Sequence, residues 1–157
     1  MILDERNEFA DAVSVAAAAG TALIGDVIDL GSASRDIGSG QPVYLIIQTD
    51  TEIITGGSAG TIKFQLASDS TADLATSATI HLDTGTLVTD DAAANDARLN
   101  AGGLIFSAPL PQGAVYERYL GILAVIGTTT VTAGKINAFL AFDQPPAQRA
   151  YPDAMPV

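Results

Sequence analysis

Cysteine and tryptophan are absent from the 157-residue chain, and histidine occurs once. The lack of cysteine excludes disulfides, thiolate metal sites and a cysteine nucleophile. A single histidine cannot build the usual zinc sites within one chain. The lack of tryptophan removes the bulkiest side chain on which a glycosidase stacks its sugar. Carboxylates remain as the groups that could hold a hard cation such as Ca²⁺.

Basic residues are also scarce. The chain has 7 Lys and Arg against 18 Asp and Glu, a net charge of −11, and charged residues make up only 16% of it. Phosphate backbones repel an anionic surface of this kind. We therefore expect no binding to nucleic acid.

Long apolar runs are missing as well. The alanine-rich stretch 13–20 follows an acidic segment, whereas a signal peptide begins with positive charge. No apolar run approaches the roughly 20 residues that a membrane helix requires. We expect a protein made in the cytoplasm that has no membrane partner.

Short segments of alternating polarity separated by glycine-rich turns dominate the sequence. In the segment 61–68, for example, Ile62, Phe64 and Leu66 share one face of a strand. With no convincing long amphipathic helix and at most one helix at 91–99, the pattern predicts an all-β antiparallel sandwich of the jelly-roll or immunoglobulin type. The expected strands cover residues 27–30, 42–49, 61–68, 78–88, 103–110, 119–127 and 130–142.

We expect one domain with three parts. Residues 1–39 are predicted to form an extended arm with one short strand, residues 40–143 the sandwich, and residues 144–157, which are rich in proline, an extended tail. The strands at 42–49 and 119–127 are apolar on both faces, which predicts a homo-oligomer, with dimer and trimer both open. Deletion of residues 1–15 or 150–157 is expected to leave the sandwich folded and to weaken attachment to a partner.

Two groups of residues have the types that site chemistry uses, but each lacks a needed part. Asp90, Asp91, Asn95 and Asp96 offer oxygen ligands for Ca²⁺, yet without the spacing or central glycine of an EF-hand loop, so a solvated loop or helix cap is favoured. His81 and Asp83 share a predicted strand face, but no nucleophile motif accompanies them, so a surface histidine is favoured.

Two further segments have simpler interpretations. Asp50 and Glu52 follow a strand end, where carboxylates commonly meet solvent, and residues 37–40 (IGSG) are too short for a phosphate-binding loop. We therefore expect no enzyme, no cofactor and no metal.

A set of segments, in order along the chain, resembles the jelly-roll capsid cement (decoration) proteins of tailed bacteriophages. The segments read MILDERNEFADAVSV, DVIDLGSASRDIGSGQPVYLIIQTDT, APLPQGAVYERYLGILAVI, TAGKINAFLAFD and a late YP, whereas residues 56–100 follow no such pattern. The resemblance implies a small β-sandwich on the exterior of the phage head, bridging copies of the major capsid protein as a homo-oligomer. The alternative from another class is a carbohydrate-binding or receptor-binding jelly roll of a phage particle, which would need an aromatic platform or a cation site.

Nine residues are candidates for contact with the capsid or with a second copy. They combine the apolar residues of the two chain ends with the Arg, Asp and Tyr positions that match the resemblance: Ile2, Leu3, Phe9, Arg35, Asp36, Arg118, Tyr119, Arg149 and Tyr151. For the arginines, which bind carboxylates in a forked geometry, an internal Arg–Asp pair that ties the arm to the sandwich is the favoured alternative.

Overall fold

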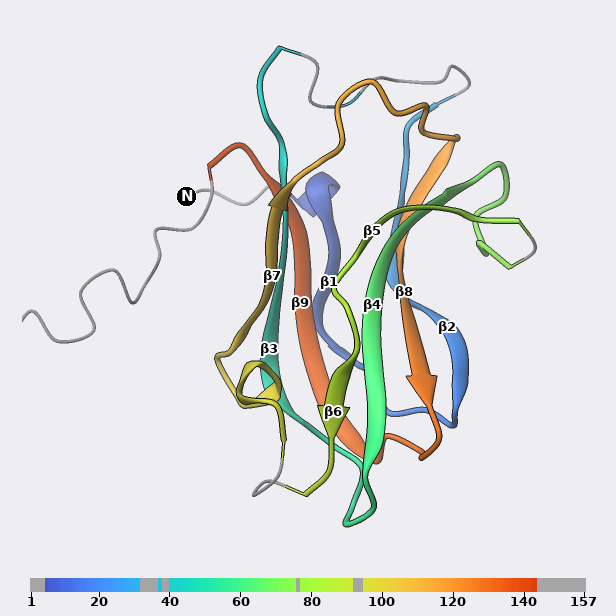
Figure 1. The fold of residues 1–157 in the computed structure, drawn as a ribbon. Coiled ribbons are helices and arrows are strands. Elements are labelled where there is room, and N and C mark those ends of the chain that lie inside the picture. The colour runs from blue at the N-terminus through green and yellow to red at the C-terminus, as the bar shows by residue number, and fades with distance from the viewer. Residues whose placement is uncertain (1–4, 32–36, 38–39, 76, 92–94, 144–157) are drawn as a thin grey trace, which may run out of the picture.

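The computed structural model describes residues 5–31, 37, 40–75, 77–91 and 95–143. Two antiparallel sheets pack face to face (Figure 1). In the first sheet the strand order is β1 (Glu8–Ser14), β9 (Ala133–Ala141), β3 (Tyr44–Ile54) and β7 (Leu104–Pro109). In the second sheet it is β2 (Gly20–Asp29), β8 (Tyr119–Gly127), β4 (Gly60–Asp69) and β5 (Thr79–Asp83), with β6 (Leu87–Thr89) also paired to β4.

The chain passes from one sheet to the other at almost every connection. The strands β1, β3, β7 and β9 form one sheet and the strands between them form the other, which is the double Greek-key path of a jelly roll. The predicted all-β antiparallel sandwich of jelly-roll type is therefore confirmed. No helix among the described residues is long and apolar enough to cross a membrane.

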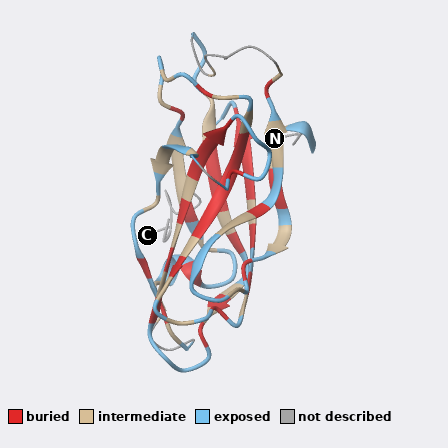
Figure 2. Ribbon diagram, turned by 90° about the vertical axis from the view of Figure 1, so that its right-hand side faces the viewer, coloured by how far each residue is buried: buried red, intermediate tan, exposed pale blue. Residues whose placement is uncertain are grey.

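The core lies between the sheets, as the buried segments in Figure 2 show. Ile62, Phe64 and Leu66 on β4 are fully buried, as the alternation predicts. On the opposite face of the same strand, Lys63 and Gln65 both donate hydrogen bonds to Asp83 of β5, at 2.9 and 2.7 Å. Period-two alternation therefore locates this strand and its inner face correctly.

The predicted N-terminal arm is wrong for the residues that the structure describes. Residues Glu8–Ser14 pair with β9 and residues Gly20–Asp29 pair with β8, so this region supplies one edge strand to each sheet. Phe9 and Val15 are each only 1% exposed. The irregular pattern misled because β1 and β2 both contain register shifts, which break the alternation.

The two edge strands approach closely at Gly25 of β2. This glycine has φ +68°, and a Cβ there would collide with the backbone carbonyl of Phe9. Only glycine adopts such a conformation at low cost and leaves room for the neighbouring chain. Gly25 therefore allows β1 and β2 to close one side of the sandwich.

Both faces of the two doubly apolar strands are covered within the chain. On the outer face of the first sheet, Ile46, Phe139 and Ala141 form a small buried cluster. On the outer face of the second sheet, Leu123 packs with Leu74 of the β4–β5 connection. The reason given for predicting an oligomer is therefore wrong, although the oligomer itself stays a prediction.

Three smaller points concern the local structure. The strands β8 and β9 follow one another in the chain but belong to different sheets, so they do not form a hairpin. The expected helix at 91–99 is reduced to a 3₁₀ turn, η2 (Ala97–Leu99), with residues 92–94 outside the described part of the chain. The predicted tail, 144–157, also lies outside it.

Candidate interaction site at one end of the sandwich

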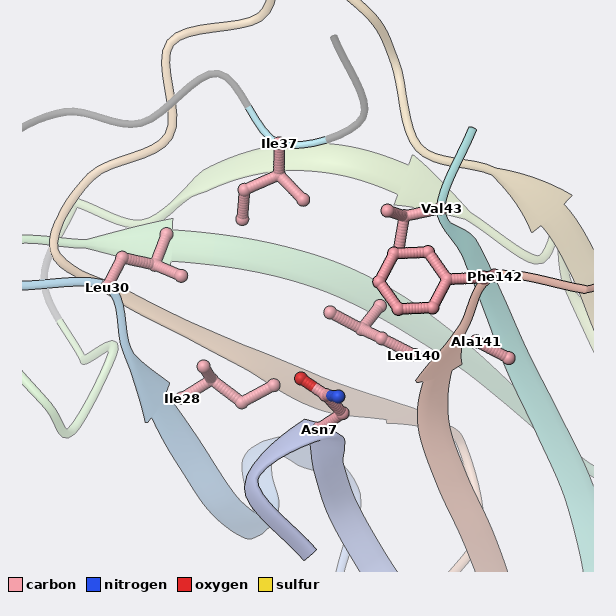
Figure 3. A pocket seen from close by; sticks show the side chains of 8 residues that line it. All are labelled: Asn7, Ile28, Leu30, Ile37, Val43, Leu140, Ala141 and Phe142. Atoms are coloured by element: carbon pink, nitrogen blue, oxygen red, sulfur yellow. The ribbon is translucent and has the colours of Figure 1, made fainter. Parts of the chain in front are cut away.

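A small apolar pocket opens at the end of the sandwich where β2 and β9 finish and β1 and β3 begin (Figure 3). Its volume is about 230 Å³. All of its lining side chains are apolar except that of Asn7, which ends the 3₁₀ turn η1 (Glu5–Asn7). The lining residues are Asn7, Ile28, Leu30, Ile37, Val43, Leu140, Ala141 and Phe142.

Phe142 gives this end an exposed aromatic ring. It is 61% exposed although it follows directly on the buried end of β9. In Figure 3 its ring lies beside Val43 at one side of the pocket. An exposed ring next to an apolar hollow is a feature of sites that bind another surface.

The β7–β8 connection runs past the same end and is held firmly at several points. The backbone N–H of Leu110 donates to the carbonyl of Val43 at 2.7 Å, and that of Leu30 donates to the carbonyl of Arg118 at 2.7 Å. Tyr116 is fully buried, and its hydroxyl donates to the carbonyl of Pro111 at 3.0 Å. The ends of the connection are thus bonded to two residues that line the pocket.

Val115, next to the buried Tyr116, projects from this anchored connection. It is 71% exposed, the highest value among the large apolar residues reported as exposed in the described part of the chain. An apolar side chain held on a fixed backbone loses little conformational freedom when a partner covers it. Val115 and Phe142 are therefore the two exposed apolar residues best placed for contact at this end.

His81 anchors the same connection, because a β-bulge turns it inward. The ladder between β4 and β5 shifts register between Leu66 and Ala67, so His81 is half-buried while Ile80 is 43% exposed. The sequence favours a surface histidine at this position, so the half-buried His81 side chain differs from that expectation. A bulge reverses the alternation that follows it, and no local signal in the sequence marks this one.

His81 contacts two residues of different elements. Its Nε2 lies 2.8 Å from the hydroxyl of Ser68, and its ring centroid lies 4.3 Å from that of Tyr116. The backbone N–H of Glu117 donates to the same Ser68 hydroxyl at 3.0 Å. Burial lowers the pKa of His81, and the negative charge of Glu117 opposes this shift.

This Ser–His pair holds β4, β5 and the β7–β8 connection together and is not a catalytic dyad. The side chain of Ser68 is fully buried, so a substrate has no access to its hydroxyl. Asp83, which was considered as the partner of His81, instead forms an ion pair with Lys63 at 2.9 Å. The absence of enzyme activity stays a prediction.

Arg118 makes the internal Arg–Asp pair that the sequence favoured. Its Nε and Nη2 donate to the two carboxylate oxygens of Asp29 at 3.0 and 2.9 Å, and its guanidinium lies 4.9 Å from the centre of the Tyr119 ring. The side-chain hydrogen bonds from Arg118 lower the pKa of Asp29 to about 2. The pair joins the end of β2 to the start of β8, with Asp29 as its acid.

The acidic residues at 90–96 are engaged with the protein. Asn95 accepts a hydrogen bond from the backbone of Asp90 and donates to the carbonyl of Ile53, and Asp96 forms an ion pair with Arg98 at 2.7 Å. Within the described ranges, no three His, Cys, Asp or Glu side chains lie together as metal ligands. The cap interpretation is confirmed for Asp96, whose side chain accepts from the N–H of Arg98 in η2.

The nine candidate contact residues divide into three groups. Phe9 is a core residue, so its assignment as a contact was wrong. Arg118 and Tyr119 lie at the sandwich end that holds the pocket, with Arg118 about half exposed. The other six lie outside the described residues: Ile2, Leu3, Arg35, Asp36, Arg149 and Tyr151.

Sequence reasoning missed the pocket itself. Its residues come from η1, from β2, from the β2–β3 connection and from the end of β9, and nothing local shows that these four places meet. The one available signal was Phe142, a large apolar residue directly before Asp143 and the proline-rich tail.

One comparison with known proteins identifies a family for the chain. A search of curated proteins finds no match to the chain. The family model of Bbp16 matches residues 9–140, which run from the first strand to the last. The chain therefore belongs to the Bbp16 family.

Proposed function

We propose that the protein is a structural virion component, a capsid cement protein that binds the outer surface of a tailed-phage head and bridges major capsid protein subunits. The proposal begins from the resemblance in the sequence. The jelly-roll fold agrees with that resemblance. The same proposal includes self-association and no catalytic step.

The proposal rests on where in the sequence the residues at the pocket end lie. All eight pocket residues, together with Val115 and Arg118, fall within the segments on which the resemblance rests. None of them falls within residues 56–100, the part of the chain that follows no family pattern. The pocket, Phe142 and the anchored β7–β8 connection therefore all belong to the part of the chain that carries the resemblance.

The physical role of such a protein depends on the rigidity of its contact segment and on the number of copies bound to the shell. The β7–β8 connection is fixed by the buried Tyr116 and by the Ser68–Glu117 hydrogen bond, so its exposed Val115 keeps one position. A single small contact of this kind is weak. Many copies on a closed shell act together, so modest contacts sum to a large barrier against separation of capsid subunits.

The anionic character of the chain suits the exterior of a head. With a net charge of −11, the protein is repelled by packaged DNA. Its lack of cysteine makes folding independent of the redox state of the compartment.

The test is co-sedimentation of purified protein with phage heads that lack their decoration protein. We expect saturable binding and a higher bursting temperature of the heads. Val115→Asp should weaken binding by about tenfold or more, because it places a charge where an apolar side chain would be buried. Val88→Asp is the matched control, since Val88 is also exposed but lies on β6, in the part without resemblance. Equal binding by both variants, or none by the unmodified protein, would contradict the proposal.

The exposed ring of Phe142 could serve the carbohydrate-binding alternative, but among the described residues no group of potential metal ligands lies together to hold a cation. Tyr116 is buried, and Tyr119 lies beneath Arg118. A glycan array tests it directly. Selective glycan binding without binding to heads would replace the present proposal.

A further inference from the structure

The pocket at the sandwich end has the size of a single aromatic ring. Its volume of about 230 Å³ is below the roughly 300–1,000 Å³ of sites for drug-sized ligands. Apolar cavities near 150 Å³ already accept benzene. A pocket of this size therefore suits one side chain of a protein better than a cofactor.

The lining suits tyrosine in particular. Aliphatic side chains such as Ile28, Leu30 and Leu140 form the walls, and Figure 3 shows the Asn7 amide at the pocket between Ile28 and Leu140. A tyrosine ring combines an apolar body with a polar hydroxyl that seeks a hydrogen-bond partner when buried. An amide supplies both a donor and an acceptor for that hydroxyl.

The chain contains four tyrosines, and three of them belong to the sandwich. Tyr44 lies on β3, Tyr116 is buried, and Tyr119 begins β8 beneath Arg118. The fourth, Tyr151, belongs to the segment 144–157, which begins two residues after Phe142 of the pocket lining. The segment that contains Tyr151 therefore begins next to the pocket.

From these observations we infer that the pocket of one copy binds the Tyr151 side chain of a second copy. Pro145 and Pro146 favour an extended backbone soon after Phe142. Nine residues at roughly 3.1 Å each allow Tyr151 to lie up to about 28 Å from Phe142. That reach is close to twice the radius of gyration of about 15 Å expected for a chain of this length, so it is long enough for the pocket of a neighbouring copy.

This inference deepens the self-association included in the proposed function, and it is tested without phage heads. Because the chain has no cysteine, single cysteines can be introduced cleanly. Full-length Val43→Cys protein, with the cysteine in the pocket wall, is mixed with full-length Tyr151→Cys protein and oxidised. We expect a disulfide-linked dimer of one Val43→Cys chain and one Tyr151→Cys chain, since a disulfide forms only between nearby Cα atoms.

The matched control is Val88→Cys, another valine substitution but on β6. It should yield far less mixed dimer with Tyr151→Cys than Val43→Cys does. Equal yields with both partners would overturn the inference. So would a double variant, Val43→Cys with Tyr151→Cys, that oxidises entirely within single chains.

Sedimentation equilibrium gives an independent readout. Tyr151→Ala should raise the dissociation constant of the oligomer roughly thirtyfold or more, as expected for a buried aromatic anchor. Tyr151→Phe should cause a smaller rise, because it keeps the ring and loses only the bond to Asn7. An unchanged dissociation constant for Tyr151→Ala would overturn the inference, whereas co-sedimentation of that variant with heads measures capsid binding separately.

Discussion

Shortening Phe9 to alanine is expected to destabilise the sandwich by about 3–5 kcal/mol, the usual cost of removing a buried aromatic side chain. Phe9 is 1% exposed and lies in the main core cluster, although its position near the N-terminus led us to predict a surface contact. It is held on β1, which pairs with β9 at the edge of the first sheet. Domains of this size have a total unfolding free energy of about 5–15 kcal/mol, so this one change removes a large part of it.

Deletion of residues 1–15 should have a larger effect than Phe9→Ala. It removes the whole of β1, with the buried Ala10 and Val15 as well, and exposes the edge of β9. We expect the truncated chain to be unfolded at 25 °C, which reverses the expectation from the sequence that the sandwich would stay folded.

The assay is urea unfolding followed by circular dichroism, with Val115→Ala as the control. Val115 is 71% exposed, so its truncation should change the unfolding free energy by no more than about 0.5 kcal/mol. If Phe9→Ala keeps the wild-type midpoint while binding to heads falls, Phe9 is a contact residue after all and the core assignment is refuted.

Three further changes test the interior joints and the ionic pair. Gly25→Ala should cost more than 1 kcal/mol in the same urea assay, because a Cβ there meets backbone at a positive φ, whereas Gly85→Ala, with open space around it, should cost less. Burial lowers the pKa of His81 in the folded state, so the stability that this residue contributes is complete above about pH 6.5 and is lost as the pH falls toward the folded pKa. His81→Gln should lose this pH dependence of the unfolding free energy. An identical pH profile for both proteins would contradict the prediction. The carboxyl of Asp29, followed by NMR, should titrate near pH 2 and contribute stability that is present above about pH 4 and lost as the pH falls through 2; Arg118→Ala should return its pKa toward the ordinary value.

Local sequence patterns predicted the strands of the sandwich well where side chains alternate without interruption. The strand β4 shows this, since Ile62, Phe64 and Leu66 enter the core as expected. Such predictions succeed because the burial of one face requires a period of two, and that period is visible in a few consecutive residues.

The same reasoning failed where register shifts interrupt the alternation. The strands β1 and β2 were taken for an arm, and His81 was assigned to the outer face of its strand. One extra residue in a strand reverses the direction of the side chains beyond it, and the partner strand that fixes its position is distant in sequence. No window of local sequence contains that partner.

The sequence by itself determined the class of this protein: all-β, anionic and free of cysteine, with a resemblance to one kind of phage protein. Only the tertiary structure decided that Phe9 is a core residue, that Arg118 pairs with Asp29, and that the ends of β2 and β9 meet the segments before β1 and β3 around an apolar pocket. Composition and alternation act over a few residues, whereas these three outcomes depend on contacts between strands up to about 130 positions apart, such as that of β1 with β9. Packing between distant segments, and not local preference, therefore placed the site.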